Sequence, residues 1–229
     1  MDYLTKKSKI KDLAIHRKKD RMIGFPEGYV QVPEHFSYVS PITEKADNFD
    51  SPIMFIMQDW RSKESGKKSP KIVSEFGYDP KRKTNKVFDN YLKQCFKLKR
   101  KDVYITNAFV FVKTGDISAS IKGGVNTKEY CIKEYTLKEI EIIKPRLVVC
   151  LGKYAYTEIT KVLNREKYVQ ESKKRFRERV NKPFFYKDIC ITAICHPATG
   201  ESCAGSKEAY EKQWTDLFKQ FRSLSQIKN

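Results

Sequence analysis

The sequence lacks the features of a membrane or secreted protein. Its longest apolar runs, such as 52–57 and 147–151, are far shorter than the roughly 20 residues that a membrane helix needs. The first 21 residues contain no apolar stretch of the kind that forms the centre of a secretory signal. We therefore expect a cytoplasmic protein without a membrane partner.

Patterns typical of metal and cofactor sites are also lacking. The six cysteines form no CxxC pair, and no two of the three histidines have metal-ligand spacing. Lys122-Gly123-Gly124 is too short to be a Gly-rich phosphate loop. We therefore expect no metal and no cofactor, and we expect the cysteines to be reduced residues of the core.

Acidic residues are scarce relative to basic ones. The chain has 46 Lys and Arg against 28 Asp and Glu, which gives a net charge of +18. Residues 61–101 alone carry 14 basic against 4 acidic side chains, and residues 165–187 carry 9 against 3. Aromatic residues are interleaved with both clusters, which favours a polyanionic partner such as DNA over a lysine-rich surface that serves solubility alone.

The length and composition suit one domain. With 229 residues and 40% hydrophobic content, the chain can build a single ordinary core. Residues 1–45 are expected to form a basic N-terminal arm and an irregular lead-in with several prolines, and residues 46–229 the domain itself. We expect a monomer.

Apolar runs alternate with helical patterns along the domain. Four runs have strand character, at 53–57, 103–112, 146–152 and 188–197. Helical periodicity appears at 86–96, 127–143, 154–163 and 207–224. This alternation predicts a three-layer α/β/α fold with a central, mostly parallel four-stranded sheet.

Polar residues stand near the ends of three of these runs, where such sheets bind ligands. Gln58 and Asp59 follow the first run, Asn107 lies within the second, and His196 follows the fourth. Each has an ordinary explanation when taken alone: a capping acid, a satisfied core amide and a structural histidine before proline. Their joint occurrence is what suggests a site.

Together these stretches resemble the motifs of the uracil-DNA glycosylase superfamily. The matching stretches are Met57-Gln58-Asp59-Trp60, Asn107-Ala108 and His196-Pro197-Ala198, and the segment 131–155 resembles the family's helix and strand that end in Leu-Gly. The resemblance covers about residues 50–222 and keeps the family's order. It implies a DNA glycosylase that flips a pyrimidine from double-stranded DNA and hydrolyses its N-glycosidic bond.

The resemblance also implies roles for individual residues. Asp59 would activate water and stabilise the cationic sugar, and His196 would donate a hydrogen bond to the pyrimidine O2. Asn107 would read the Watson–Crick edge of uracil or, with its amide turned, of cytosine. Further base contacts are expected from Gln58, Trp60, Phe76 and Tyr78, and contacts to the DNA backbone from Lys81, Arg82, Lys83, Lys113 and Thr199.

The first motif departs from the uracil-strict branch of the family. In that branch a tyrosine blocks substituents at C5 of the pyrimidine, whereas here Arg61 and Ser62 follow Trp60. The base therefore stays open between uracil, which indicates repair, and a C5-modified pyrimidine such as a modified cytosine of phage DNA, which indicates antiviral defence. The alternatives are an inactive DNA-binding module on the same fold and, less favoured, a metal-dependent hydrolase.

Overall fold

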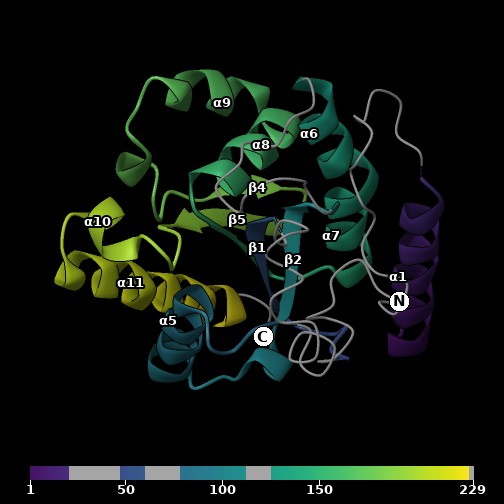
Figure 1. Cartoon of the computed structure of the whole chain (residues 1–229), viewed down its shortest axis with the longest axis horizontal. Helices are drawn as coiled ribbons and strands as arrows, with labels where there is room; N and C mark the ends of the chain where they lie inside the picture. Colours follow the sequence, from purple (N-terminus) through teal and green to yellow (C-terminus); the bar gives the residue numbers. More distant parts are fainter. Residues whose placement is uncertain (21–46, 60–77, 112–124, 227–229) are drawn as a thin grey trace.

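A central sheet with helices on both faces forms the protein (Figure 1). The computed structural model describes residues 1–20, 47–59, 78–111 and 125–226. The expected three-layer α/β/α architecture is confirmed, with five strands in the order β2-β1-β3-β5-β4. The first four strands in this order are parallel, and β4 is antiparallel to β5. The strands are β1 (Ile53–Asp59), β2 (Tyr104–Phe109), β3 (Leu147–Leu151), β4 (Phe184–Tyr186) and β5 (Ile189–Ile194).

The strand count of four was wrong, and the missing strand is β4. It has only three residues and pairs with β5 at the edge of the sheet. Its central side chain, Phe185, is 63% exposed. A short edge strand with one solvent-exposed face does not have the long apolar run of a buried strand. It is also too short to show an alternation of apolar and polar residues.

All four predicted helical patterns lie on helices. The first begins at Lys83, three residues before the predicted start, and continues into a π-helical turn at Leu92–Phe96. The second pattern covers two consecutive α-helices, which are joined by another π-helical turn at Ile132–Thr136. The helices are α1 (Tyr3–Lys19), α5 (Lys83–Tyr91), α6 (Val125–Cys131), α7 (Leu137–Ile143), α8 (Lys153–Leu163), α9 (Arg165–Ser172), α10 (Gly200–Ala204) and α11 (Lys207–Gln226).

Alternate side chains of β1 pack into different hydrophobic cores on the two faces of the sheet. In β1, Met54 and Ile56 pack towards α7 and α8, whereas Phe55 packs towards α5 and α11. Trp214 of α11 is fully buried and stacks on Tyr91 with ring centroids 5.5 Å apart. The aromatic side chains of α11 therefore belong to the core on this face of the sheet.

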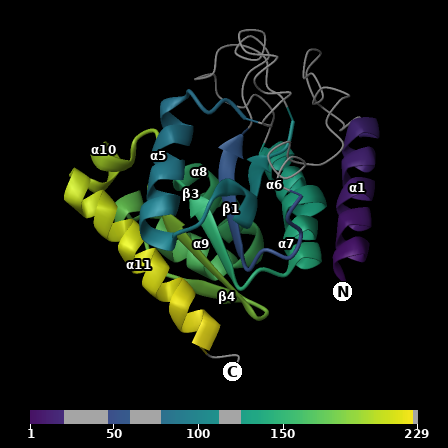
Figure 2. The ribbon, with the colours of Figure 1, turned by 90° about the horizontal axis from the view of Figure 1, so that it is seen from below.

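The N-terminal helix α1 lies alongside α7, as both views show (Figures 1 and 2). Ile10 on its inner face is fully buried, and Arg17 is only 1% exposed. Lys6 forms an ion pair with Asp50 at 2.8 Å. The structure thus fixes the first part of the expected basic arm against the domain, while the proposed boundary at residue 46 stays a prediction.

The hydroxyls of Tyr130 and Tyr135 both donate to Asp20, just beyond the end of α1. This carboxylate ties the first helix to α6 and to the turn that follows it. None of the helices in the described ranges combines the length and apolar character needed to cross a membrane.

The cysteines differ in part from expectation. Cys131, Cys150 and Cys190 are buried thiols, but Cys195 and Cys203 are joined in a disulfide. The seven residues between these two cysteines carry no disulfide signal in the sequence. The chain reversal at α10 brings their Cα atoms within 6.0 Å, and only the folded backbone reveals it.

Candidate active site

A pocket of about 510 Å³ opens at the carboxyl ends of β1, β3 and β5. These strands are neighbours in the sheet and parallel, so their carboxyl ends meet at one edge. Three chain segments supply the described lining residues: Gln58, Leu151 and Gly152 from the strand ends, Lys153, Tyr154, Thr157 and Glu158 from α8, and His196 and Thr199 from the loop after β5. Among the described residues, no group of three His, Cys, Asp or Glu is placed to hold a metal ion.

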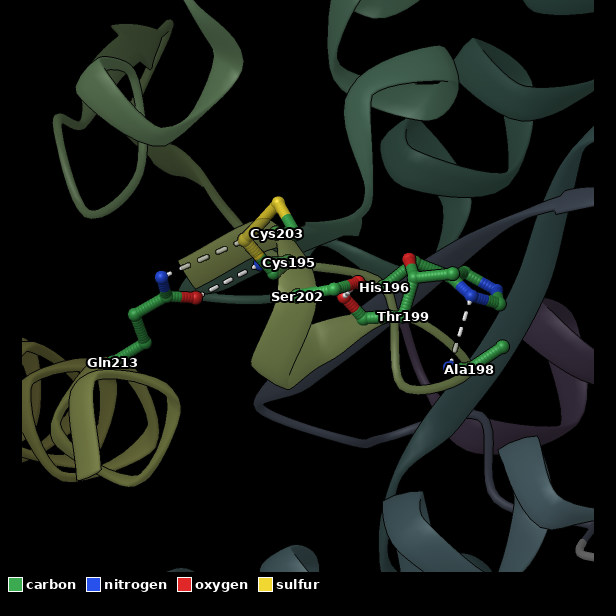
Figure 3. Close-up of a disulfide and its surroundings, with 7 residues drawn as sticks. All are labelled: Cys195, His196, Ala198, Thr199, Ser202, Cys203 and Gln213. Atoms are coloured by element: carbon green, nitrogen blue, oxygen red, sulfur yellow. Dashed lines mark hydrogen bonds between the residues drawn. A yellow bond between two sulfur atoms is a disulfide. The ribbon is translucent and has the colours of Figure 1, made fainter. Parts of the chain in front are cut away.

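The loop after β5 fixes the orientation of His196 (Figure 3). The Thr199 N–H donates to the His196 carbonyl at 2.9 Å, which closes a tight turn. Within this turn the Ala198 N–H donates to Nδ1 of His196 at 3.2 Å. Because a neutral imidazole has one donor and one acceptor nitrogen, acceptance at Nδ1 places the ring proton on Nε2.

Burial keeps this imidazole neutral. Removal from water lowers the pKa of His196 below its ordinary value of 6.5, and the Asp59 carboxylate partly opposes this shift. Neutral His196 therefore offers a hydrogen-bond donor, not a cation, near pH 7. Asp59 is thus the charged group whose electrostatic effect reaches the imidazole.

Gln58 and Asp59 are the last two residues of β1. Gln58 lines the pocket beside α8. The Gln58 side-chain amide donates to the Asp59 carboxylate at 3.1 Å, so the two are coupled. Both side chains are partly exposed.

Asn107 lies one strand away, beside the end of β1. It pairs in register with Met57 and is 5% exposed. Its backbone carbonyl accepts the Thr136 hydroxyl at 3.3 Å. The structure thus brings Asn107 next to the Gln58-Asp59 pair, although the described lining of the pocket does not include it.

Tyr78 packs on Arg100 of the 3-10 turn Arg100–Asp102, and it is not among the described residues that line the pocket. Its ring covers the Arg100 guanidinium at 3.9 Å, and Arg100 in turn donates to Asp89 at 2.6 Å. Burial raises the pKa of the Tyr78 hydroxyl. Its role in stacking on a flipped base stays a prediction.

The residues that are expected to contact the DNA backbone lie in two separate parts of the structure, one before and at the start of α5 and one in the pocket. Lys81 and Lys83 are exposed at the start of α5, and Arg82 pairs with Asp79 at 3.6 Å. Thr199 lines the pocket itself. Trp60, Phe76 and Lys113 lie outside the described residues.

Sequence reasoning missed the contribution of α8. Lys153, Tyr154, Thr157 and Glu158 line the pocket because β3 lies between β1 and β5, so the chain that leaves β3 enters the space between Gln58 and His196. Gly152 caps α8 with a φ of +96° and without a side-chain hydrogen bond. The sequence did contain a signal for this contribution: the apolar run 146–152 ends in Leu151-Gly152, directly before α8.

The first turn of α8 makes this side of the pocket electropositive. The N–H groups at a helix N-terminus carry a partial positive charge, and the N-cap residue Gly152 has no side chain that could accept from them. The Lys153 side chain, which is exposed, adds a full charge. Such an arrangement suits an anionic group such as a phosphate.

The fold and the pocket define an α/β protein that binds its ligand at the carboxyl ends of parallel strands. The family model of the Uracil DNA glycosylase superfamily matches residues 49–218, which is more than half of the chain. The chain therefore belongs to the uracil-DNA glycosylase superfamily, as its motifs predict. No curated protein matched the sequence.

Proposed function

We propose that this protein is a monofunctional DNA glycosylase. It would rotate a pyrimidine nucleotide out of double-stranded DNA, hydrolyse the bond between the base and C1′ of the sugar, and leave an abasic site. The observation that carries this proposal is that His196, whose pKa is lowered by burial and raised by the Asp59 carboxylate, lines a pocket together with Gln58, the neighbour of Asp59 in β1. We further propose that the protein acts as a cytoplasmic monomer.

The two groups meet the opposite charges that develop in this reaction. As the bond breaks, the sugar becomes cationic and the base leaves as an anion. The Asp59 carboxylate stabilises the sugar and orients the attacking water, while Nε2 of His196 donates to the base oxygen that gains charge. A preorganised donor of this kind contributes roughly 3–4 kcal/mol in well-studied oxyanion sites.

Contacts to the phosphates provide the free energy for base flipping. Removing a base from the stack costs a few kcal/mol. The α8 N-terminus with Lys153 offers one phosphate contact beside the pocket, and the exposed Lys81 and Lys83 offer others. We propose that these contacts hold the backbone while Gln58 and Asn107 bind the base.

The proposed base is either uracil or a pyrimidine with a C5 substituent. The tyrosine that excludes such substituents in the uracil-strict branch is missing after Trp60, which supports an open position beside C5. Uracil excision would serve DNA repair, whereas excision of a modified cytosine would serve defence against phage.

Duplex oligonucleotides with one uracil, 5-hydroxymethyluracil, 5-hydroxymethylcytosine or glucosylated 5-hydroxymethylcytosine test this proposal. Alkaline strand cleavage after incubation reports abasic sites. Asp59→Asn should lower the excision rate by about 100-fold or more, because it removes the charge that stabilises the sugar. Asp216→Asn on α11 changes a partly exposed carboxylate that is not among the described residues of the pocket, and it should act as the wild type.

Glu158→Gln is a sharper comparison, because Glu158 is the carboxylate that lines the pocket itself. A larger loss in Glu158→Gln than in Asp59→Asn would contradict the role of Asp59. Abasic sites on none of the substrates, together with equal DNA binding by the wild type and Asp59→Asn, would instead support a DNA-binding module without catalysis.

A further inference from the structure

The loop that carries His196 is closed into a covalent ring. The ladder between β3 and β5 ends where Leu151 pairs with Ile194. The next residue, Cys195, is bound through the disulfide to Cys203 in α10, with the two Cα atoms 6.0 Å apart. Residues 196–202, which include the whole His196 turn, lie inside this ring (Figure 3).

Gln213 of α11 holds the first residue of the ring. Its side-chain oxygen accepts the Cys195 N–H at 3.0 Å, and its side-chain nitrogen lies 3.5 Å from the Cys195 sulfur as a donor. Gln213 is only 9% exposed, so this contact is made away from water. The side chain thus replaces the strand partner that the Cys195 N–H lacks beyond the end of the ladder.

The hydrogen bonds that orient the imidazole form within the ring. Thr199 donates to the His196 carbonyl at 2.9 Å, and the Cys203 N–H donates to the Thr199 carbonyl at 2.9 Å. The turn is therefore continuous with α10. That helix has only five residues, too few to be stable without tertiary contacts. The disulfide fixes α10 to the sheet and, through it, the turn that holds His196.

The disulfide is accessible from one side. Cys195 is fully buried, whereas Cys203 is partly exposed. A thiolate can therefore reach the Cys203 sulfur while Cys195 remains the leaving group in the core. This is the arrangement expected of a bond that can be reduced without unfolding of the sheet.

We propose that Cys195 and Cys203 are positioning residues for His196, and that reduction of their disulfide lowers the rate of base excision. A dithiol reductant supplies two electrons and two protons. The bond between the two cysteine sulfurs breaks, two thiols form, and the dithiol becomes a cyclic disulfide. The effect on rate rests on the proposed glycosylase function, whereas the effect on the loop does not.

The covalent state is tested first. Unreduced protein is denatured and alkylated, and the modified cysteines are counted by mass spectrometry. We expect four alkylated cysteines, with Cys195 and Cys203 recovered in crosslinked peptides, and six after treatment with dithiothreitol. Six alkylated cysteines without the reductant would overturn the proposal.

The functional test compares oxidised wild type, reduced wild type and Cys203→Ser. Single-turnover excision should be about 10- to 100-fold slower in the last two, because small displacements of a catalytic group have effects of this size. DNA affinity should stay close to that of the oxidised wild type. Cys95→Ser is the matched control: it removes a partly exposed cysteine outside the ring and should respond to the reductant like the wild type.

Hydrogen exchange separates failure of this proposal from failure of the proposed function. Amides of residues 196–203 should exchange faster in reduced protein and in Cys203→Ser, while those of β3 stay protected. Faster exchange in a protein that excises no base would leave the positioning proposal intact and refute the glycosylase. Normal excision by reduced protein and by Cys203→Ser would refute positioning and leave the glycosylase intact. Unchanged exchange in both states would also refute positioning, whatever the activity.

Discussion

Gly152 packs directly against His196. A Cβ atom added at residue 152 would lie 2.9 Å from the His196 Cβ, closer than such atoms approach in real proteins. The backbone there has a φ of +96°, which L side chains rarely adopt. The end of β3 and the imidazole can therefore be neighbours only because residue 152 has no side chain.

Gly152→Ala should lower both stability and activity. Backbone strain and the forced shift of His196 together should reduce the free energy of unfolding by about 1–3 kcal/mol, measured by denaturant titration. The excision rate should fall more than DNA affinity. Gly205→Ala is the matched control, because Gly205 has a φ of +101° with nothing within 4 Å of the added Cβ. Equal losses of activity in the two variants would show that contact with His196 has no role.

Asp59→Asn should lower the pKa of His196 further. In the wild type the Asp59 carboxylate raises this pKa, while burial lowers it more strongly. Removal of the carboxylate leaves burial unopposed, so the imidazole should gain its proton only at lower pH. NMR titration of the His196 ring checks this. An unchanged or higher pKa in Asp59→Asn would show that the two side chains do not interact in solution.

The excision rate should fall as acid protonates His196. Protonated Nδ1 can no longer accept the Ala198 N–H, and the ring loses the geometry described above. Because burial places the pKa of His196 below 6.5, the rate should stay level at neutral pH and decline only on the acid side of that value. A rate that rises on acidification through this region would contradict a neutral His196 donor.

Glu139→Gln should change how stability depends on pH. Glu139 of α7 is fully buried and accepts hydrogen bonds from Tyr104 at 2.6 Å and Thr106 at 2.7 Å. Burial raises the pKa of Glu139 from 4.5 to about 7. The folded protein therefore binds this proton more tightly than the unfolded chain, and the free energy of unfolding should fall as pH rises through this interval.

Glutamine has no such proton to lose but can still pair with both hydroxyls. The stability of the wild type relative to Glu139→Gln should thus decline as pH rises from about 4.5 to about 7. Urea titrations of both proteins across this range measure the difference. A difference that stays constant would show that Glu139 titrates as an exposed carboxylate does.

Lys153→Ala should weaken DNA binding and reduce its salt dependence. If Lys153 neutralises one phosphate, the slope of log affinity against log salt concentration should become shallower by about one. Lys219→Ala on the outer face of α11 is the control, since its side chain is 72% exposed and pairs with Asp216. Equal slopes for the wild type and Lys153→Ala would place the phosphate contact elsewhere.

Much of the sheet could be predicted from the sequence because buried parallel strands are continuous apolar runs. The runs that became β1, β2, β3 and β5 were identified for this reason. His196 and Gln58 were recognised because each follows such a run, and the structure places both in the pocket. Their catalytic and binding roles stay predictions.

The residues of α8 were missed because strand order is not encoded in periodicity. Only the position of β3 between β1 and β5 makes Tyr154 and Glu158 part of the pocket. The Cys195–Cys203 disulfide was missed for a similar reason, since it depends on a chain reversal at a helix of five residues. Both features arise from tertiary arrangement, which a single sequence does not display.

Because α1 packs against the domain, the folded unit extends beyond the N-terminal boundary of the family match. The match begins at Phe49, yet Ile10 and Ala14 are fully buried in the same cores as the sheet, and Lys6 donates to the Ile143 carbonyl at 3.0 Å. A fragment cut at the family boundary would expose the apolar surface that α1 covers, and such surface promotes aggregation. The segment that matches the family is therefore shorter than the segment that packs together as one folded unit.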